Sequence, residues 1–274
     1  MRWANAYIGL REGMNMVSLQ GRVVLITGAS SGIGALTAKL LAKRGAIPVL
    51  TARSRDKLLR LSETIESDHE VYEMDVSSAE QVASVAASVH ARFGTIDILL
   101  NNAGYGEFIS FAEAPLSHFE EMMDVNYMGT VRCTHAVLPY MLQAGCGHIV
   151  NVASLAGKMA TAKSTGYAAT KHAVLGFTNA LRRELRGSGI YVSAVNPGPI
   201  DTPFFRRADP EGTYVRNVRK FILQPDRVAE AIVSVMERRT AELDMPWAAG
   251  VGAKLAQLFP RTVDKLFGKF LNKK

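Results

Sequence analysis

The sequence predicts an α/β fold, with one domain built on a parallel sheet of seven strands and helices packed on both faces of the sheet. Two observations support this prediction. Short apolar runs rich in β-branched residues alternate with longer stretches of helical period, which is the pattern of repeated βαβ units. The chain has 274 residues, 48% hydrophobic and 21% charged, which is enough for one large core, and it contains no linker, repeat or low-complexity segment.

The predicted strands are short apolar segments that follow one another at the spacing of βαβ units. In order they are VVLITG (23–28), IPVLTAR (47–53), VYEMDV (71–76), DILLNNAG (97–104), HIVNVAS (148–154), IYVSAVNPG (190–198) and AELDMP (241–246). The intervening stretches have helical period, and helices are predicted over 33–44, 78–93, 115–143, 165–186 and 225–239. Residues 1–18 are interpreted as an N-terminal extension, 19–246 as the folded domain and 247–274 as a basic amphipathic C-terminal extension.

Charge and cysteine content narrow the function classes. The net charge is +7, but lysine and arginine are spread along the chain without a basic arm, so the sequence favours anionic small molecules over nucleic acid. Cys133 and Cys146 lie on or just past one predicted helix, about 20 Å apart at 1.5 Å per residue, too far for a disulfide. No apolar run is long enough to span a bilayer and the opening residues do not form a secretory signal, so a cytoplasmic location is predicted.

A glycine-rich turn follows the first predicted strand. It reads Gly28-Ala-Ser-Ser-Gly32-Ile-Gly34 and leads directly into the first predicted helix. Glycines between a strand and a helix allow a tight turn and a close backbone approach, which leaves the amides of the helix N-terminus free to bind a phosphate. The turn therefore predicts a pyrophosphate site, although its spacing is GxxxGxG rather than the common GxGxxG.

The end of the second predicted strand bears on the kind of nucleotide. Arg53 stands where an NAD-binding protein would place a carboxylate that accepts hydrogen bonds from the ribose 2′-hydroxyl. A guanidinium at this place instead binds a 2′-phosphate through charge-assisted hydrogen bonds. NADP is therefore favoured over NAD, with an arginine that only ends a strand in solvent as the alternative.

Tyr167 and Lys171 stand four residues apart in a predicted helix, in the sequence YAATK. Positions four apart share a helix face, so the phenol and the ammonium point into the same space. These five residues alone leave open whether the pair is catalytic or lies on a solvated surface. A tyrosine that works near pH 7 needs its pKa lowered by roughly three units, about 4 kcal/mol. An ammonium roughly 5 Å away supplies about 3 kcal/mol at an effective dielectric of 20, so the catalytic reading makes Lys171 the group that lowers the tyrosine pKa.

Six motifs in order resemble the short-chain dehydrogenase/reductase family. They are TGASSGIG (27–34), NNAG (101–104), Asn126, Ser154, YxxxK (167–171) and PGPIDT (197–202), and the resemblance covers residues 20–246. It implies a single-domain, doubly wound Rossmann fold and an intact catalytic tetrad of Asn126, Ser154, Tyr167 and Lys171. In this interpretation Tyr167 delivers the proton, Ser154 hydrogen-bonds the substrate carbonyl, and Asn126 holds a water that links to Lys171.

The resemblance also implies a set of residues for NADP(H). Asp75 resembles the adenine contact, the NNAG segment runs beneath the adenosine, Lys171 binds the ribose, and the segment from Pro197 borders the nicotinamide carboxamide. The predicted cofactor-binding residues are Gly28, Ser30, Ser31, Gly32, Ile33, Gly34, Arg53, Ser54, Asp75, Val76, Asn102, Ala103, Gly104, Tyr167, Lys171, Pro197, Gly198, Ile200 and Thr202. No metal is predicted, because the histidines, among them His118, His135, His148 and His172, show no ligand spacing.

The segment 204–224 resembles a mobile substrate lid of low regularity. It places Phe204, Phe205, Tyr214 and Phe221 among Arg206, Arg207, Arg216, Arg219 and Lys220, which suits a large apolar substrate with a polar end. The function predicted is NADP-dependent interconversion of a bulky apolar ketone or aldehyde and an alcohol, with a 3-oxoacyl thioester reductase or a non-catalytic NADP sensor as alternatives. A homodimer or homotetramer is expected, and the C-terminal extension either covers the substrate pocket or contacts a membrane surface weakly.

Overall fold

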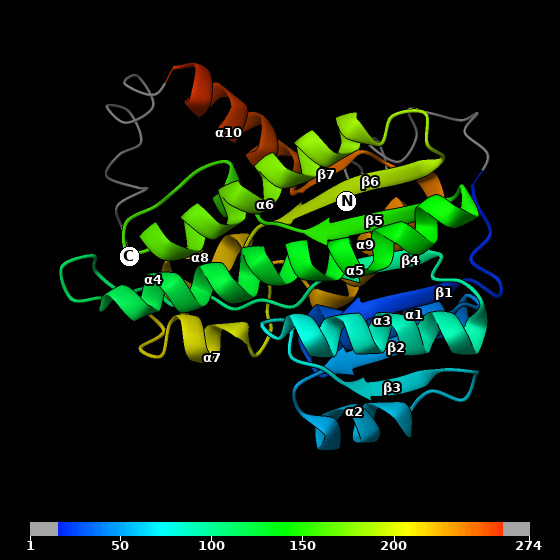
Figure 1. The fold of residues 1–274 in the computed structure, drawn as a ribbon. Coiled ribbons are helices and arrows are strands. Elements are labelled where there is room, and N and C mark those ends of the chain that lie inside the picture. The colour runs from blue at the N-terminus through cyan, green and yellow to red at the C-terminus, as the bar shows by residue number, and fades with distance from the viewer. Residues whose placement is uncertain (1–15, 260–274) are drawn as a thin grey trace.

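The computed structural model describes residues 16–259, and it has a single parallel sheet with helices on both faces (Figure 1). Residues 1–15 of the predicted N-terminal extension and residues 260–274 of the predicted C-terminal extension lie outside the described residues. The strands are β1 (Val23–Thr27), β2 (Ile47–Ala52), β3 (Glu70–Glu73), β4 (Ile98–Asn101), β5 (Gly147–Val152), β6 (Ile190–Pro197) and β7 (Glu242–Met245). Each of the seven predicted strands is therefore present.

The helices cover most of the chain between the strands. They are α1 (Gly32–Lys43), α2 (Arg55–Ser62), α3 (Ala79–Phe93), α4 (Leu116–Met123), α5 (Gly129–Ala144), α6 (Thr165–Glu184), α7 (Phe204–Ala208), α8 (Thr213–Val218), α9 (Pro225–Arg238) and α10 (Trp247–Leu258). Short 3-10 helices cover Leu155–Gly157 and Arg219–Phe221. Among the described residues, no helix combines the length and the apolar character needed to cross a membrane.

The strand order is β3-β2-β1-β4-β5-β6-β7, and every pair is parallel. The chain runs outward from β1 to β3, then returns to the other side of β1 with β4. This reversal opens a crevice beyond the carboxyl ends of β1 and β4, which is where open α/β sheets bind ligands. The architecture confirms the predicted doubly wound sheet.

Two apolar cores lie on the two faces of the sheet. Side chains alternate along a strand, so Val24 and Ile26 of β1 pack into the core beneath α1 and α9, while Val23 and Leu25 pack into the core beneath α3, α5 and α6. All five residues of β1 are buried, as expected for a parallel strand covered on both faces. The sheet is thus held rigidly between two helical layers, with its carboxyl edge left open for a site.

Four local predictions differ from the structure. The predicted strand 97–104 ends at Asn101, because Asn102 leaves the sheet to bond the glycine turn, and the predicted strand 71–76 ends at Glu73. The predicted helix 115–143 is divided into α4, a π-helix over Asp124–Met128 and α5. The segment 204–224 is more regular than predicted, since α7 and α8 form there. Helices α2 and α10 were not predicted.

Candidate active site

A cavity of about 1090 Å³ opens beyond the carboxyl ends of the strands. Its walls come from the turns after β1 to β6 and from α7 and α8. It contains all of the predicted cofactor-binding residues except Gly34, and three of the predicted tetrad, with Asn126 outside the lining. Residues more than 100 positions apart in sequence are therefore brought to one hollow by the parallel sheet.

The glycine turn follows β1, which lies between β2 and β4 in the sheet, and it lines the cavity. Gly28 has φ +66° and Gly32 has φ +56°, values that side chains rarely adopt. A Cβ on Gly34 would lie 2.5 Å from both the Gly28 carbonyl oxygen and Asn102 Nδ2, so Gly34 keeps the helix packed close to the turn instead of facing the cavity. Helix α1 has no side-chain cap at Ser31 and no acidic residue in its first turn. Its N-terminal amides therefore face the cavity with the geometry that suits a pyrophosphate.

The NNAG segment holds this turn in place. Asn102 Nδ2 donates to the carbonyl oxygens of Thr27, at 3.0 Å, and Gly28, at 3.1 Å. In return the Thr27 hydroxyl accepts hydrogen bonds from the backbone amides of Asn102 and Ala103, each at 3.0 Å. A Cβ on Gly28 would lie 2.8 Å from the Ala103 Cα. The segment therefore supports the glycine turn from below as well as lining the cavity.

Two cations lie at the far end of the cavity, beyond β2. Arg53 is exposed and lines the cavity, and within residues 16–259 it makes no hydrogen bond or ion pair. Lys57, in the first turn of α2, also lines the cavity and is exposed. Asp75 lies nearby, where its carboxylate accepts from the amide and hydroxyl of Ser77 at 2.9 and 2.7 Å. This end of the cavity is cationic and open to a phosphate.

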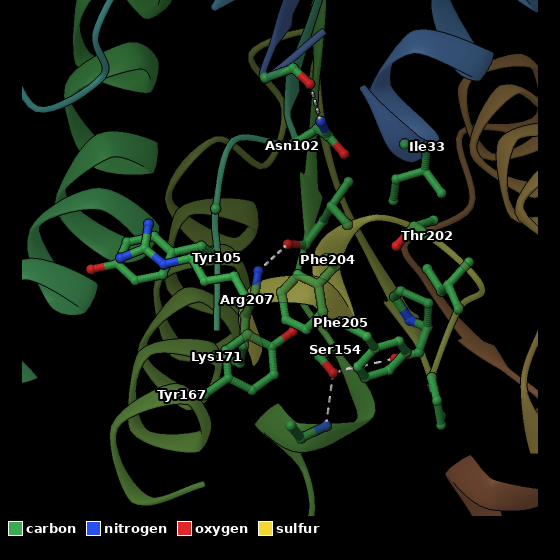
Figure 2. A pocket seen from close by; sticks show the side chains of 18 of the residues that line it. Ile33, Asn102, Tyr105, Ser154, Tyr167, Lys171, Thr202, Phe204, Phe205 and Arg207 are labelled. Carbon is green, nitrogen blue, oxygen red and sulfur yellow. Dashed lines mark hydrogen bonds between the residues drawn. The ribbon is translucent and has the colours of Figure 1, made fainter. Parts of the chain in front are cut away.

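Ser154, Tyr167 and Lys171 meet on the opposite side of the cavity (Figure 2). Ser154 follows β5, and its Oγ donates to the Pro197 carbonyl oxygen at 3.3 Å and accepts from the Ala156 amide at 3.0 Å. Tyr167 and Lys171 come from α6, as the spacing predicted. Lys171 Nζ lies 5.8 Å from the centroid of the Tyr167 ring and donates to the Val152 carbonyl oxygen at 2.9 Å.

Burial governs the ionisation of this group. It raises the pKa of Tyr167 to about 12, with a hydrogen bond to Ser154 acting weakly in the opposite direction. Burial also lowers the pKa of Lys171 to about 8. The lowering of the tyrosine pKa predicted from the sequence is therefore not produced by the side chains alone. The ammonium is directed at the Val152 carbonyl rather than at the phenol, and desolvation of the phenolate is the larger effect.

Asn126 lies behind the cavity wall in the π-helix. Its Nδ2 donates to the Tyr105 carbonyl oxygen at 2.8 Å and to the Thr170 hydroxyl at 3.1 Å, and its Oδ1 accepts from the Tyr105 amide at 2.9 Å. A Cβ on Gly104 would lie 3.0 Å from this Oδ1 and 3.7 Å from Lys171 Nζ. Asn126 therefore fixes the backbone beside Lys171, and its role in holding a water stays a prediction.

An aromatic cluster forms the remaining wall. Phe204 packs against Tyr167 with ring centroids 5.6 Å apart, and Phe205 packs against Tyr214 at 5.7 Å. Phe108 continues the cluster, 4.9 Å from Tyr214. The four aromatic residues predicted for the lid all line the cavity, as do Arg207 and Arg216, whereas Arg206 and Arg219 do not. The side chain of Lys220 lies outside the described part.

Arg207 ties α7 to the loop after β4. Its guanidinium lies 3.7 Å above the Tyr105 ring and bonds Glu107, whose other oxygen is 3.1 Å from His118 Nδ1. This arginine is therefore paired within the protein. Arg216, which also lines the cavity, is bonded among the described residues to the Glu211 carbonyl oxygen and the Thr213 hydroxyl, both neutral, so it leaves one cationic group at the aromatic wall. Lys57, Tyr105, Phe108 and Met159 also line the cavity and were not predicted. Of these four, only Lys57 could have been predicted from the sequence, because it is a second basic residue four positions after Arg53.

The structure shows the surroundings of four histidines and both cysteines. His118 and His148 are buried, and His148 bonds the Ser193 hydroxyl at 2.7 Å. His172 bonds the Ala168 carbonyl, and His135 is exposed. No group of metal-ligating side chains occurs among residues 16–259, and Cys133 and Cys146 are both free thiols.

Comparison with known sequences identifies relatives along most of the chain. A sequence model of the short chain dehydrogenases matches residues 22–212. An uncharacterized oxidoreductase of Staphylococcus saprophyticus is 38% identical over 227 residues, which cover 81% of this chain and 94% of that protein. An uncharacterized oxidoreductase of Staphylococcus haemolyticus is 39% identical over 219 residues, with 80% and 92% covered.

Two solved structures are similar in fold. A variant of actinorhodin polyketide ketoreductase with NADPH has a TM-score of 0.76 and 32% identity, covering 82% of this chain and 95% of that one. An alcohol dehydrogenase from the archaeon Thermococcus sibiricus, complexed with 5-hydroxy-NADP, has a TM-score of 0.73 and 30% identity, with 82% and 96% covered.

Proposed function

Because this chain belongs to the short-chain dehydrogenase family of oxidoreductases, we propose that it is an NADP-dependent enzyme that interconverts a bulky apolar ketone or aldehyde and an alcohol. One observation carries the proposal. A single cavity has a glycine turn in its wall, cations after β2 on one side of that turn, and Ser154, Tyr167 and Lys171 with an aromatic wall on the other side. The first two features suit a phosphorylated dinucleotide, and the third suits a carbonyl group.

The three polar side chains divide the work of carbonyl reduction. When bound, the nicotinamide supplies the hydride that reaches the carbonyl carbon. The Ser154 hydroxyl donates a hydrogen bond to the carbonyl oxygen, and Tyr167 transfers its phenolic proton to the same oxygen as charge develops there. The Lys171 ammonium then offsets the negative charge left on the phenolate. Asn126 acts as a positioning residue, because it holds the backbone of Tyr105 next to this group.

The preference for NADP rests on Arg53 together with Lys57. Each is exposed at the end of the cavity where an adenosine ribose would lie if the pyrophosphate sits on the glycine turn. A 2′-phosphate placed there receives charge-assisted hydrogen bonds from both side chains. The NADPH complex of the ketoreductase relative and the NADP analogue in the alcohol dehydrogenase relative support the same choice.

The substrate class rests on the aromatic wall. Phe204, Phe205 and Tyr214 enclose the space next to Tyr167, and the nearby Arg207 is already paired with Glu107. A large apolar body fits this wall, and Arg216, which lines the same cavity, suits a polar or anionic end of such a substrate. A 3-oxoacyl thioester reductase is the second candidate. One of the two solved structures similar to this chain is named a polyketide ketoreductase, which is an enzyme that reduces a ketone.

Fluorescence titration of NADPH and NADH tests the cofactor assignment. We expect NADPH to bind more tightly, and Arg53→Ala with Lys57→Ala to weaken NADPH by about 10- to 100-fold while NADH binding changes little. Lys43→Met, at an exposed lysine of α1 away from the cavity lining, is the control. Tighter binding of NADH by the unmodified protein would contradict the argument. Tight NADPH binding without turnover across a broad set of carbonyl compounds would instead favour the sensor alternative.

A further inference from the structure

Helix α10 presents its large apolar side chains to solvent. Its packed side consists of small residues, with Gly250 and Ala253 buried, and a Cβ on Gly250 would lie 2.1 Å from the Asp244 carboxylate. The opposite side carries the large ones, with exposed fractions of 52% for Trp247, 47% for Val251, 51% for Leu255, 70% for Leu258 and 60% for Phe259, the residue after the helix. At 100° per residue these five side chains fall within one 120° sector of the helix.

This apolar stripe, defined as Trp247, Val251, Leu255, Leu258 and Phe259, differs from an ordinary helix surface. Scattered exposed leucines need no explanation, but a contiguous stripe of large apolar residues marks an interaction surface. The only charged residue of α10 is Lys254, at the border of the stripe, and the helix has no acidic residue. A tryptophan and a phenylalanine at the ends of such a stripe are typical of helices that lie in a membrane interface.

The charge of the following segment discriminates between partners. Residues 260–274 lie outside the described part, and their sequence holds five basic side chains and one acidic, Asp264, which leaves a side-chain charge of +4. The basic residues are Arg261, Lys265, Lys269, Lys273 and Lys274. A symmetric contact between two copies would bring these like charges together, whereas an anionic lipid surface attracts them.

From the stripe and its adjacent charge we infer that α10 docks on the surface of an anionic phospholipid membrane. The inference does not depend on the activity of the enzyme, but it has a consequence for it. Pro246 and Ala249, at the start of the same helix, line the cavity. Docking by α10 therefore places the cavity wall beside the lipid phase, where apolar carbonyl compounds dissolve.

Vesicle co-sedimentation of the full chain tests this inference. We expect binding to phosphatidylcholine vesicles that contain about one third phosphatidylglycerol, and at least tenfold weaker binding to phosphatidylcholine alone or in high salt. The double variant Leu255→Ser, Leu258→Ser should lower the partition coefficient at least tenfold, since it removes two of the exposed apolar groups that the membrane would bury. Leu59→Ser is the matched control. Leu59 is also an exposed helical leucine, at 42%, but it lies on α2 at the opposite end of the molecule (Figure 1).

Tryptophan fluorescence gives a second readout. The chain has two tryptophans, so in a Trp3→Phe background Trp247 alone reports, and its emission should shift to the blue when anionic vesicles are added. Equal melting temperatures of the variants and the parent protein show that folding is intact. Absence of vesicle binding, equal binding to neutral vesicles, or unchanged binding of the double serine variant would each overturn the inference. The inference would also be overturned if the double serine variant bound vesicles like the parent protein but sedimented in solution with a different mass. The stripe would then be a contact between two copies of the chain.

Discussion

Replacing Lys171 with methionine removes a buried cation while keeping a side chain of similar length. The Lys171 side chain is buried with its Nζ bonded to the Val152 carbonyl, and burial lowers its pKa from the ordinary 10.5 to about 8. A shift of this size corresponds to about 3 kcal/mol by which the folded state disfavours the charged lysine. In the variant, losing the cost of burying the charge stabilises the folded state, and losing the hydrogen bond to Val152 destabilises it. The two effects oppose each other, so the net change in the free energy of unfolding at one pH is small.

The pH dependence isolates the cost of burying the charge. Below about pH 8 the lysine is charged in both states, and the folded protein bears the full burial cost. Between about 8 and 10.5 the folded lysine loses its proton while the unfolded one keeps it, so the unfolded chain binds more protons and stability rises with pH. By about pH 9.5, roughly 2 of the 3 kcal/mol are recovered.

Thermal unfolding of the two proteins without added cofactor measures this difference. The melting temperature of the parent protein minus that of Lys171→Met should be about 4–8 °C larger at about pH 9.5 than at about pH 7. Lys43→Met, at an exposed lysine of α1, should show no such change, because water solvates that ammonium in both states. A difference between parent and Lys171→Met that stays constant with pH would refute the reasoning, since the lysine would then be as well solvated as in the unfolded chain.

Three further predictions concern the site and the assembly. Tyr167→Phe should lower kcat by about 10² to 10⁴ through loss of the proton donor, with NADPH affinity in a fluorescence titration unchanged; near-normal turnover would contradict the assignment. Gly106→Ala should raise KM for a bulky ketone about tenfold and also lower kcat, because its Cβ would lie 2.7 Å from the Phe204 ring and 3.0 Å from the Tyr167 ring and would push the two rings apart. At Gly176 of α6 an added Cβ would meet no atom within 4 Å beyond the backbone of its own helix, so Gly176→Ala should leave the kinetics unchanged. Equal KM values in the two variants would count against a role for Phe204. Sedimentation at micromolar concentration should show a homodimer or homotetramer, since α4, the π-helix and α5 leave Leu116, Met128 and Leu142 exposed along one continuous helical stretch. A monomer would refute this.

Much of the fold follows from local sequence patterns. The β-branched runs predict all seven strands, because parallel strands buried on both faces must be apolar along their whole length. The strand ends are less accurate, since the end of β4 depends on Asn102 bonding to Thr27, 75 residues away. The π-helix around Asn126 was not predicted for a similar reason, because the side chain of Asn126 bonds the distant backbone of Tyr105.

By itself, the sequence determined the chemistry available to this protein: a glycine turn after a strand, an arginine in place of a carboxylate, and a tyrosine one helical turn before a lysine. Only the tertiary structure decided how these groups act on one another. It directed the Lys171 ammonium at Val152, and its burial of Tyr167 raised the phenol pKa where the catalytic interpretation of the pair had predicted a fall. It also turned the large apolar residues of α10 outward. Desolvation and orientation depend on neighbours from distant segments, and for that reason no local pattern encodes them.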